Sequence, residues 1–494
     1  MGSLDNGSSA GSRQFPAGFV WGTGTSAYQI EGAVSADGRG QSIWDVFSHT
    51  RGNVYRGDTG DIACDSYNLL EDDVRIIRDL GVGAYRFSVS WTRIQPTGNG
   101  PANRAGLDYY RRLSERLREA GVAPIATVYH WDLPQALEDQ GGWGKRDTAQ
   151  RMADFAHILG EGLGDLVGTW ITINEPLQTV HQGYRVGSQA PGLRDQELAA
   201  AATHHVLLGH GLVLQALRAT TPAGTEIGPT MDPQPFIALD AAAEAVIDAV
   251  DAEHNRVYTD PVFHKRYPAE ARPEMLPPDS LIQSGDFDII GAPIDFFGLN
   301  YYRPHYLRAG DFSDLRLGES PIHDFPGIVE YMAPDLPRTV MGWPNVPGSL
   351  RDQLVSLHEE TGGLKLYITE NGCAAADYVG TDGEIRDHER IAYIQGHLEA
   401  AWQAIQDGVN LAGYFHWSLM DNFEWSHGYR QRFGLHFVDF ETRRRIPKLS
   451  AKYYGDIARS GLLPSWEETF PVDGPVVLEP SAIPVGALGI PGAA

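Results

Sequence analysis

Two stretches, TWITINEP at residues 169–176 and KLYITENG at residues 365–372, decide the fold. Each contains an apolar, β-branched run that predicts a buried strand, and each ends at a glutamate beside an asparagine. These glutamates are Glu175 and Glu370. In a barrel of parallel strands, catalytic groups lie at the carboxyl ends of the strands. Two carboxyl groups there indicate acid/base and nucleophilic chemistry on one bond. Taken alone, each of the two residues could equally be an ordinary surface glutamate at a strand end.

Strand-like runs recur along the whole chain, and amphipathic helical stretches separate most of them. The eight predicted strands span residues 19–25, 84–91, 124–130, 169–174, 226–231, 296–302, 366–369 and 411–419. Apolar residues at helical spacing predict helices over 64–80, 105–120, 148–163, 198–219, 349–360, 389–406 and 450–460. Strands that alternate with helices predict a parallel sheet. The absence of an obvious linker favours an α/β fold with a single (β/α)8 TIM barrel, and long loops at its C-terminal face, over three domains.

Four segments fall outside this regular pattern. Residues 1–14 are polar and rich in glycine and serine, which predicts a flexible N-terminal tail before a catalytic domain over residues 15–465. Residues 466–494 are rich in proline, which forbids a long helix and predicts an extended C-terminal tail. Residues 303–348 are too many for a simple connection and predict a functional loop over the barrel mouth. Residues 232–295 are the least regular part.

The composition limits the partners of the chain. Its net charge is −25, from 39 basic and 64 acidic residues, which argues against nucleic acids and anionic membrane surfaces. No apolar run approaches the ~20 residues of a membrane-spanning helix, and no signal peptide is visible, so we expect a cytoplasmic protein. Two cysteines, Cys64 and Cys373, indicate a reducing compartment and no metal motif. We expect no metal and no cofactor, and homo-oligomer formation stays open.

Seven motifs resemble those of the β-glycosidases of glycoside hydrolase family 1, from about residue 15 to 465. The motifs are FVWGTGTSAYQIEG (19–32), YRFSVSW (85–91), YHWDLP (129–134), TINEP (172–176), FFGLNYY (296–302), YITENG (367–372) and YFHWSLMDNFEW (414–425). Each alone is a weak signal, but all seven occur in order at predicted strand ends. The resemblance implies a retaining double displacement, with Glu370 as the nucleophile and Glu175 as the acid/base.

The strand ends also carry side chains suited to a sugar. For hydroxyl groups they offer Gln29, His130, Asn174, Asn300 and Glu424, and for the apolar sugar faces Trp131, Trp417 and Trp425. A lone tryptophan at a strand end usually packs in the core, but this cluster favours a sugar site. The resemblance implies that Gln29 and Glu424 hold the hydroxyls at carbons 3, 4 and 6, and that Asn174 holds the 2-hydroxyl. It also implies that Trp343 forms the platform for the leaving group.

Arg86 and Tyr302 are expected to support the nucleophile. An unpaired charge inside a barrel is costly, so Arg86 needs a partner, and Glu370 can serve if the two face each other. The guanidinium group would then keep this carboxylate ionised, and the Tyr302 hydroxyl can donate to it. The Glu370 anion would raise the proton affinity of Glu175, so that Glu175 starts protonated.

The expected substrate is a terminal β-D-glucosyl residue of an oligosaccharide or an aryl or alkyl glycoside, with galactosyl and fucosyl residues left open. A carboxylate at Glu424 would repel 6-phospho sugars, and the glutamate at position 175, where the thioglucosidase branch has glutamine, predicts O-glycosides. Two alternatives remain: a transglycosidase that uses the same site, and a non-catalytic sugar-binding barrel, which the presence of both glutamates argues against. An unrelated phosphate-using barrel enzyme would need a glycine-rich phosphate loop, which the sequence lacks.

Overall fold

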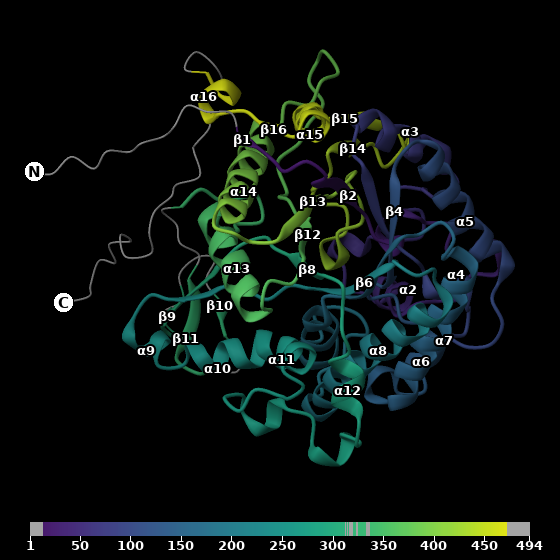
Figure 1. The fold of residues 1–494 in the computed structure, drawn as a ribbon, viewed down its shortest axis with the longest axis vertical. Helices are drawn as coiled ribbons and strands as arrows, with labels where there is room; N and C mark the ends of the chain where they lie inside the picture. The colour runs from purple at the N-terminus through teal and green to yellow at the C-terminus, as the bar shows by residue number, and fades with distance from the viewer. Residues whose placement is uncertain are drawn as a thin grey trace, which may run out of the picture.

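Eight parallel strands close into a barrel at the centre of the molecule, which confirms the predicted (β/α)8 fold (Figure 1). The computed structural model describes residues 13–311, 313, 315, 320–322, 325–331 and 336–471. Around the barrel the strands follow the order β12, β13, β2, β3, β4, β5, β6 and β8. Their bounds are β2 (Val20–Gly24), β3 (Ala84–Ser88), β4 (Ala123–Tyr129), β5 (Thr169–Asn174), β6 (Glu226–Met231), β8 (Phe297–Asn300), β12 (Leu366–Asn371) and β13 (Leu411–Trp417).

Helices form a ring outside the barrel (Figure 1). The main ones are α3 (Leu70–Leu80), α5 (Arg104–Glu119), α7 (Arg146–Leu163), α8 (Gln196–Thr220), α11 (Val257–Phe263), α13 (Pro347–Glu360), α14 (His388–Gln406) and α15 (Leu449–Ser460). Shorter helices are α1 (Ala27–Ile30), α2 (Ile43–His49), α4 (Trp91–Ile94), α6 (Gln135–Glu138) and α12 (Asp286–Ile290). The helix predicted to begin at Cys64 begins only at Leu70. Asp65 has a φ of 57°, a left-handed conformation that no α-helix can include.

Apolar side chains close the amino-terminal half of the barrel. Ala84, Ile125, Ile171, Phe296, Tyr367 and Phe415 form one buried cluster there. Gly22 is required in this layer, because a Cβ atom at this position would lie 2.3 Å from the ring of Phe415. The carboxyl-terminal half of the interior is therefore left for polar side chains, beginning with Arg86 on β3, which is 1% exposed.

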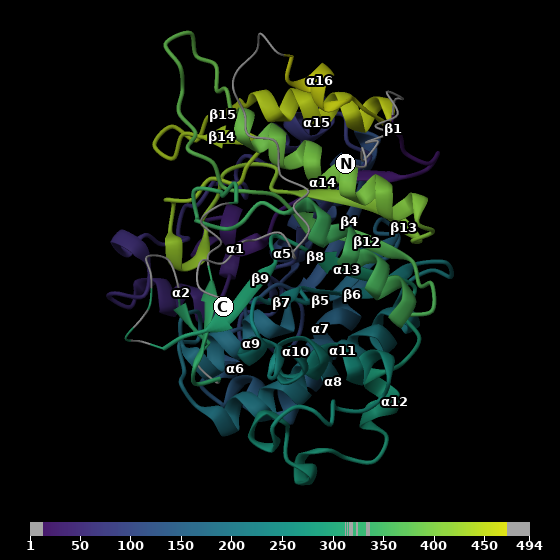
Figure 2. The same ribbon diagram turned by 90° about the vertical axis from the view of Figure 1, so that its left-hand side faces the viewer.

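The irregular segments 232–295 and 303–348 both contribute strands to a small sheet. The prediction of a loop over residues 303–348 missed this sheet. Its strands are β7 (Phe236–Ala238), β9 (His305–Ala309), β10 (Ser320–Pro321) and β11 (Ile328–Tyr331), in the order β10, β11, β9, β7. Phe325, Leu307 and Ile328 form a buried core beside this sheet, together with residues of α9 (Ala241–Glu244) and α10 (Ile247–Asp251). Figure 2 shows β7 and β9 next to α9 and α10. A second core thus orders part of the expected loop.

The ends of the described chain are more regular than predicted. β1 (Arg13–Gln14) pairs with β16 (Leu462–Leu463), so the last two residues of the expected N-terminal tail form a strand. α16 (Trp466–Thr469) stands where an extended tail was expected, because Ser465 and Glu468 form a capping box around its first turn. The rest of both predicted tails, residues 1–12 and 472–494, lies outside the described residues. β14 (His436–Val438) and β15 (Arg445–Pro447) form a hairpin. Within the described ranges, every helix is too short or too polar to cross a membrane.

Candidate active site

A pocket of about 380 Å³ opens at the carboxyl ends of the barrel strands. Most of the predicted site residues line it, namely His130, Trp131, Glu175, Asn300, Tyr302, Trp343, Glu370, Trp417, Glu424 and Trp425. Arg86 and Asn174 lie directly behind this lining and contact Glu370 and Glu175, respectively. Gln29 is also buried behind it. The structure therefore gathers all the predicted residues in one region.

Both carboxylate oxygens of Glu370 are held by donors. Arg86 Nη1 lies 2.6 Å from Oε1, and the Tyr302 hydroxyl donates to Oε2 at 2.6 Å. Glu370 is 3% exposed and lies in β12, next to Asn300 on β8. Charge-assisted hydrogen bonds of this kind are short and strong, so they fix the orientation of the carboxylate. The predicted facing of Arg86 and Glu370 is present in the structure.

Glu175 directly follows β5 and has a φ of 48°, which is unusual for a residue with a side chain. Its N–H donates to the Thr230 carbonyl at 2.9 Å, so the neighbouring strand β6 stabilises this backbone. Asn300 Nδ2 donates to Oε1 at 2.7 Å, and Asn174 Nδ2 donates to Oε2 at 3.2 Å. Burial raises the pKa of Glu175 well above its usual range, and the charges of Asp232 and Glu370 raise it further. Both effects favour the protonated form of Glu175.

Asn174 links the two glutamates and is fully hydrogen-bonded. Its amide donates to His130 Nε2 at 3.3 Å as well as to Glu175, and its Oδ1 accepts from Arg86 at 2.6 Å and from Asn300 at 3.1 Å. Burial and the Arg86 charge lower the pKa of His130 well below its usual range, so the imidazole is neutral. A sugar 2-hydroxyl must displace one of these contacts to bind Asn174, and that predicted role stays a prediction.

Aromatic rings form the walls of the pocket. The rings of Trp131 and Trp425 lie 4.6 Å apart, and both residues have positive φ angles, 76° and 52°. Trp417 stacks on His130 at 5.9 Å. Gly24 leaves room for it, since a Cβ atom there would lie 3.3 Å from the indole. Trp343 lies 5.7 Å from the ring of Tyr302, whose hydroxyl contacts Glu370. These faces suit the C–H surfaces of a sugar.

Comparison with known proteins agrees with this geometry. The family model described as glycosyl hydrolase family 1 matches residues 11–461. The chain belongs to glycosyl hydrolase family 1. This finding confirms the resemblance, the barrel fold and the prediction of a glycoside-hydrolysing enzyme.

Several relatives of this family member cover nearly its whole length. Beta-glucosidase A of Thermotoga maritima is 42% identical over 91% of this chain and 98% of its own. A bifunctional beta-D-glucosidase/beta-D-fucosidase of Bifidobacterium breve is 45% identical over 89% of this chain and 97% of its own. Among solved structures, the family 1 β-glucosidase of Thermotoga maritima in complex with isofagomine lactam superposes with a TM-score of 0.85. It is 41% identical, and the match covers 92% of this chain and 100% of that one.

Two predicted sugar-binding residues of this family 1 enzyme have unexpected surroundings. Gln29 does not line the pocket; its amide nitrogen donates to the Phe423 carbonyl at 3.0 Å and to Asn422 Oδ1 at 3.2 Å. It thus stabilises the loop that carries Glu424. Burial and the Glu370 charge raise the pKa of Glu424 to about 8. Glu424 is therefore mostly a neutral acid at pH 7, which weakens the expected repulsion of a sugar phosphate at that pH.

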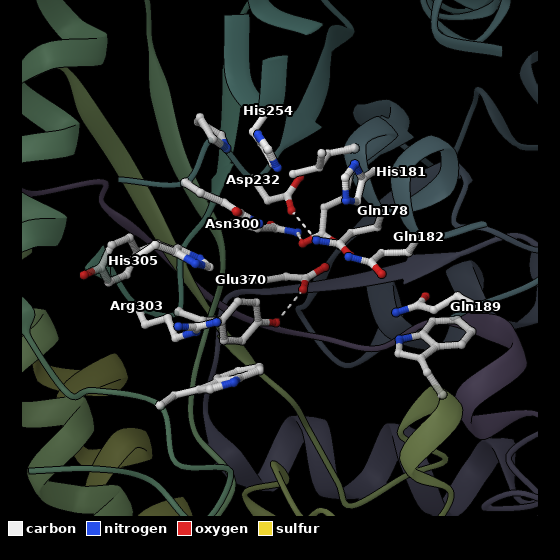
Figure 3. A pocket seen from close by; sticks show the side chains of 18 of the residues that line it. Gln178, His181, Gln182, Gln189, Asp232, His254, Asn300, Arg303, His305 and Glu370 are labelled. Atoms are coloured by element: carbon white, nitrogen blue, oxygen red, sulfur yellow. Dashed lines mark hydrogen bonds between the residues drawn. The ribbon is translucent and has the colours of Figure 1, made fainter. Parts of the chain in front are cut away.

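The pocket contains polar residues that the sequence reasoning missed, and Figure 3 shows how they surround Glu370. Arg303 and His305 lie on one side, where both pair with Glu330. On other sides of the pocket are Gln178, His181, Gln182, Asp232 and His254. Asp232 directly follows β6, so the strand-end argument that found Glu175 would have found it as well. Arg303 directly follows the predicted strand 296–302 and could have been found in the same way, whereas the others lie in segments with no regular pattern.

The expected absence of a metal and a cofactor stays a prediction. Away from the pocket, Asp260, His264 and Glu360 bring possible ligand atoms within 4.8 Å of one another, but two of the three are exposed. Cys373, near Glu370 in sequence, is buried and does not line the pocket. Burial raises the pKa of its thiol to about 12, which makes it an inert packing residue.

Proposed function

We propose that this enzyme is a retaining β-glycosidase that removes terminal non-reducing β-D-glucosyl residues from oligosaccharides or aryl and alkyl glycosides by double displacement. One observation carries the proposal: the doubly held carboxylate of Glu370 shares a pocket with Glu175, a second carboxyl group whose pKa is raised by burial. The relatives named as glucosidases support glucose, and the relative named glucosidase/fucosidase supports fucose as a second glycone. Galactose stays open.

In the first half-reaction, Glu175 gives its proton to the glycosidic oxygen while Glu370 attacks the anomeric carbon. The bond from that carbon to the leaving oxygen breaks, the leaving group departs as an alcohol, and a covalent glycosyl ester forms on Glu370. Arg86 and Tyr302 hold the attacking carboxylate in place, so that little reorganisation is needed.

In the second half-reaction, Glu370 carries no charge, because it is esterified. One of the anions that raise the pKa of Glu175 is thereby removed. Glu175, now ionised, accepts a proton from water as the water attacks the anomeric carbon and expels Glu370. Two inversions give net retention. Direct attack requires the two carboxyl groups to lie ~5–5.5 Å apart.

The test is Glu370→Gly, assayed on an aryl β-glucoside with and without sodium azide. We expect this variant to be inactive and azide to restore turnover as an α-glycosyl azide, because the anion fits the space left by the nucleophile. Proton NMR of the wild-type reaction should show the β-anomer first. Rescue with an α-product in Glu175→Gly, and none in Glu370→Gly, would reverse the two roles.

Several finer points also belong to the proposal. Transfer to an acceptor alcohol in place of water uses the same pocket, and product ratios at high acceptor concentration would measure it. The substrate is a small-molecule glycoside. Cytoplasmic location, independence from nucleic acid and any homo-oligomer stay predictions.

A further inference from the structure

A third carboxyl group, that of Asp232, lies next to the proposed acid/base. Asp232 follows β6, the strand that pairs with β5 and accepts the N–H of Glu175 through Thr230. Its side chain lines the pocket and is 9% exposed. The double displacement described above gives this residue no role.

Gln178 fixes the direction of Asp232. Gln178 Nε2 donates to Asp232 Oδ2 at 2.8 Å, drawn as a dashed line in Figure 3. The main-chain N–H of Gln178 donates to the main-chain carbonyl of Glu175 at 3.0 Å, so Gln178 connects the side chain of Asp232 to the backbone of Glu175. An asparagine would accept the same hydrogen bond from Gln178. What asparagine cannot supply is a negative charge.

That charge acts on Glu175. Burial raises the pKa of Asp232 to about 7, with a further contribution from Glu370, so Asp232 becomes an anion as the pH rises through neutrality. Among the charged neighbours that raise the pKa of Glu175, Asp232 has a larger effect than Glu370. Arg86 acts in the opposite direction.

The other titratable groups around this part of the pocket come from several elements. Arg86 comes from β3, His130 follows β4, Tyr302 follows β8, and Glu370 lies on β12. Glu424 and His427 lie after β13, while His181 and His254 come from the helical segments 178–186 and 252–256. Arg303 and His305 both pair with Glu330. Asn174 links Arg86 and His130 to the side chain of Glu175, whereas Gln178 links the side chain of Asp232 to the main chain of Glu175.

We propose that Asp232 is a positioning residue whose negative charge keeps the proton on Glu175 until the glycosidic oxygen takes it. The inference rests on the proposed acid/base role of Glu175. It also assigns a function to the second half-reaction: esterification removes the Glu370 charge that helps to raise the pKa of Asp232, so Asp232 ionises more readily and makes the ionised Glu175 a stronger base toward water.

The first test compares Asp232→Asn with wild type in kcat/KM against pH, on phenyl β-glucoside and 2,4-dinitrophenyl β-glucoside. On the phenyl substrate, we expect the alkaline limb of the variant to lie about one pH unit lower than that of wild type. The kcat/KM of the variant at pH 8.5, relative to its optimum, should therefore be about tenfold lower than that of wild type. The dinitrophenyl substrate, whose leaving group needs little protonation, should show a much smaller change. Asp232→Glu, which restores the charge, should restore the limb, and Asp260→Asn, a buried aspartate outside the pocket, should leave it unchanged.

The second test isolates the charge of Asp232 from that of Glu370. A 2-deoxy-2-fluoro-β-glucoside is used to esterify Glu370, and the rate of reactivation is followed against pH. Reactivation requires ionised Glu175, so its acid limb should lie about one unit lower in Asp232→Asn than in wild type. The proposal would be overturned if Asp232→Asn left both the alkaline limb of kcat/KM and the acid limb of reactivation unmoved. An equal loss of kcat/KM at every pH on both substrates would also overturn it. Failure of the proposed function would look different, since wild type would then neither turn over these glucosides nor form the ester.

Discussion

Replacing Glu424 by glutamine should stabilise the protein at alkaline pH and leave its stability nearly unchanged at acidic pH. The carboxyl group lines the pocket after β13, and burial together with the Glu370 charge raises its pKa from 4.5 to about 8. Below pH 4.5 both the folded and the unfolded states hold the proton. Between pH 4.5 and 8 the unfolded state loses the proton while the folded state keeps it. Wild-type stability therefore falls as the pH rises through this window.

The size of the effect follows from the two pKa values. At about 1.4 kcal/mol per unit, a shift from 4.5 to about 8 corresponds to roughly 5 kcal/mol. The side chain faces a pocket that water enters, and water around the anion reduces this cost. We therefore expect roughly 2 kcal/mol, which in a protein of 494 residues raises the melting temperature by about 2–4 °C at pH 9.

Thermal melts of wild type and Glu424→Gln at pH 5, 7 and 9 measure this effect. The difference in melting temperature should be close to zero at pH 5, intermediate at pH 7 and largest at pH 9. Glu441→Gln, at an exposed position in the β14–β15 hairpin, is the matched control and should show no such trend. If Glu424→Gln and wild type differed by the same amount at all three pH values, the burial of this charge would not be the cause.

Three further changes test other contacts of the pocket. Tyr302→Phe removes the 2.6 Å hydrogen bond to Glu370, a charge-assisted bond worth about 1.5–3 kcal/mol, and kcat/KM on an aryl β-glucoside should fall about 10- to 100-fold. Preference for unphosphorylated over 6-phospho-β-glucosides should increase as the pH rises past about 8, where Glu424 ionises; a ratio that does not change with pH would contradict this. Gly24→Val should push against Trp417, which a Cβ atom would approach to 3.3 Å, and raise KM for β-glucosides several-fold with little change in kcat.

The barrel was predictable because its strands are buried on both faces. Such strands read as continuous apolar runs, and all eight predicted runs overlap the strands of the barrel. Glu175 and Glu370 were predictable as a pair because each lies at the end of one of these strands. A strand-end position fixes the edge of the barrel on which a side chain lies. The fold then brings together residues that are 195 positions apart in the sequence.

The remaining features depend on contacts that local patterns do not encode. β9 and β11 are short strands ordered by a separate core around Leu307 and Phe325, and the segment between them gives no periodic signal. Gln29 lies in a matching motif, but the sequence does not show that its amide is already used by the loop before Glu424. Asp232 was missed although it follows a predicted strand, because the reasoning there depended on motifs rather than on position.

The acidic groups of the pocket explain why its stability and its catalysis are linked. Burial raises the pKa values of Glu175, Asp232 and Glu424, so these groups hold their protons to a higher pH than they would in water. Glycoside cleavage passes through a transition state with positive charge on the sugar ring. As the pH rises past about 8, Asp232 and Glu424 become anions, and these anions stabilise that positive charge without reorganisation. A substitution that removes one of these carboxyl groups and raises the melting temperature at pH 9 should therefore also lower kcat/KM, because both effects come from the same negative potential.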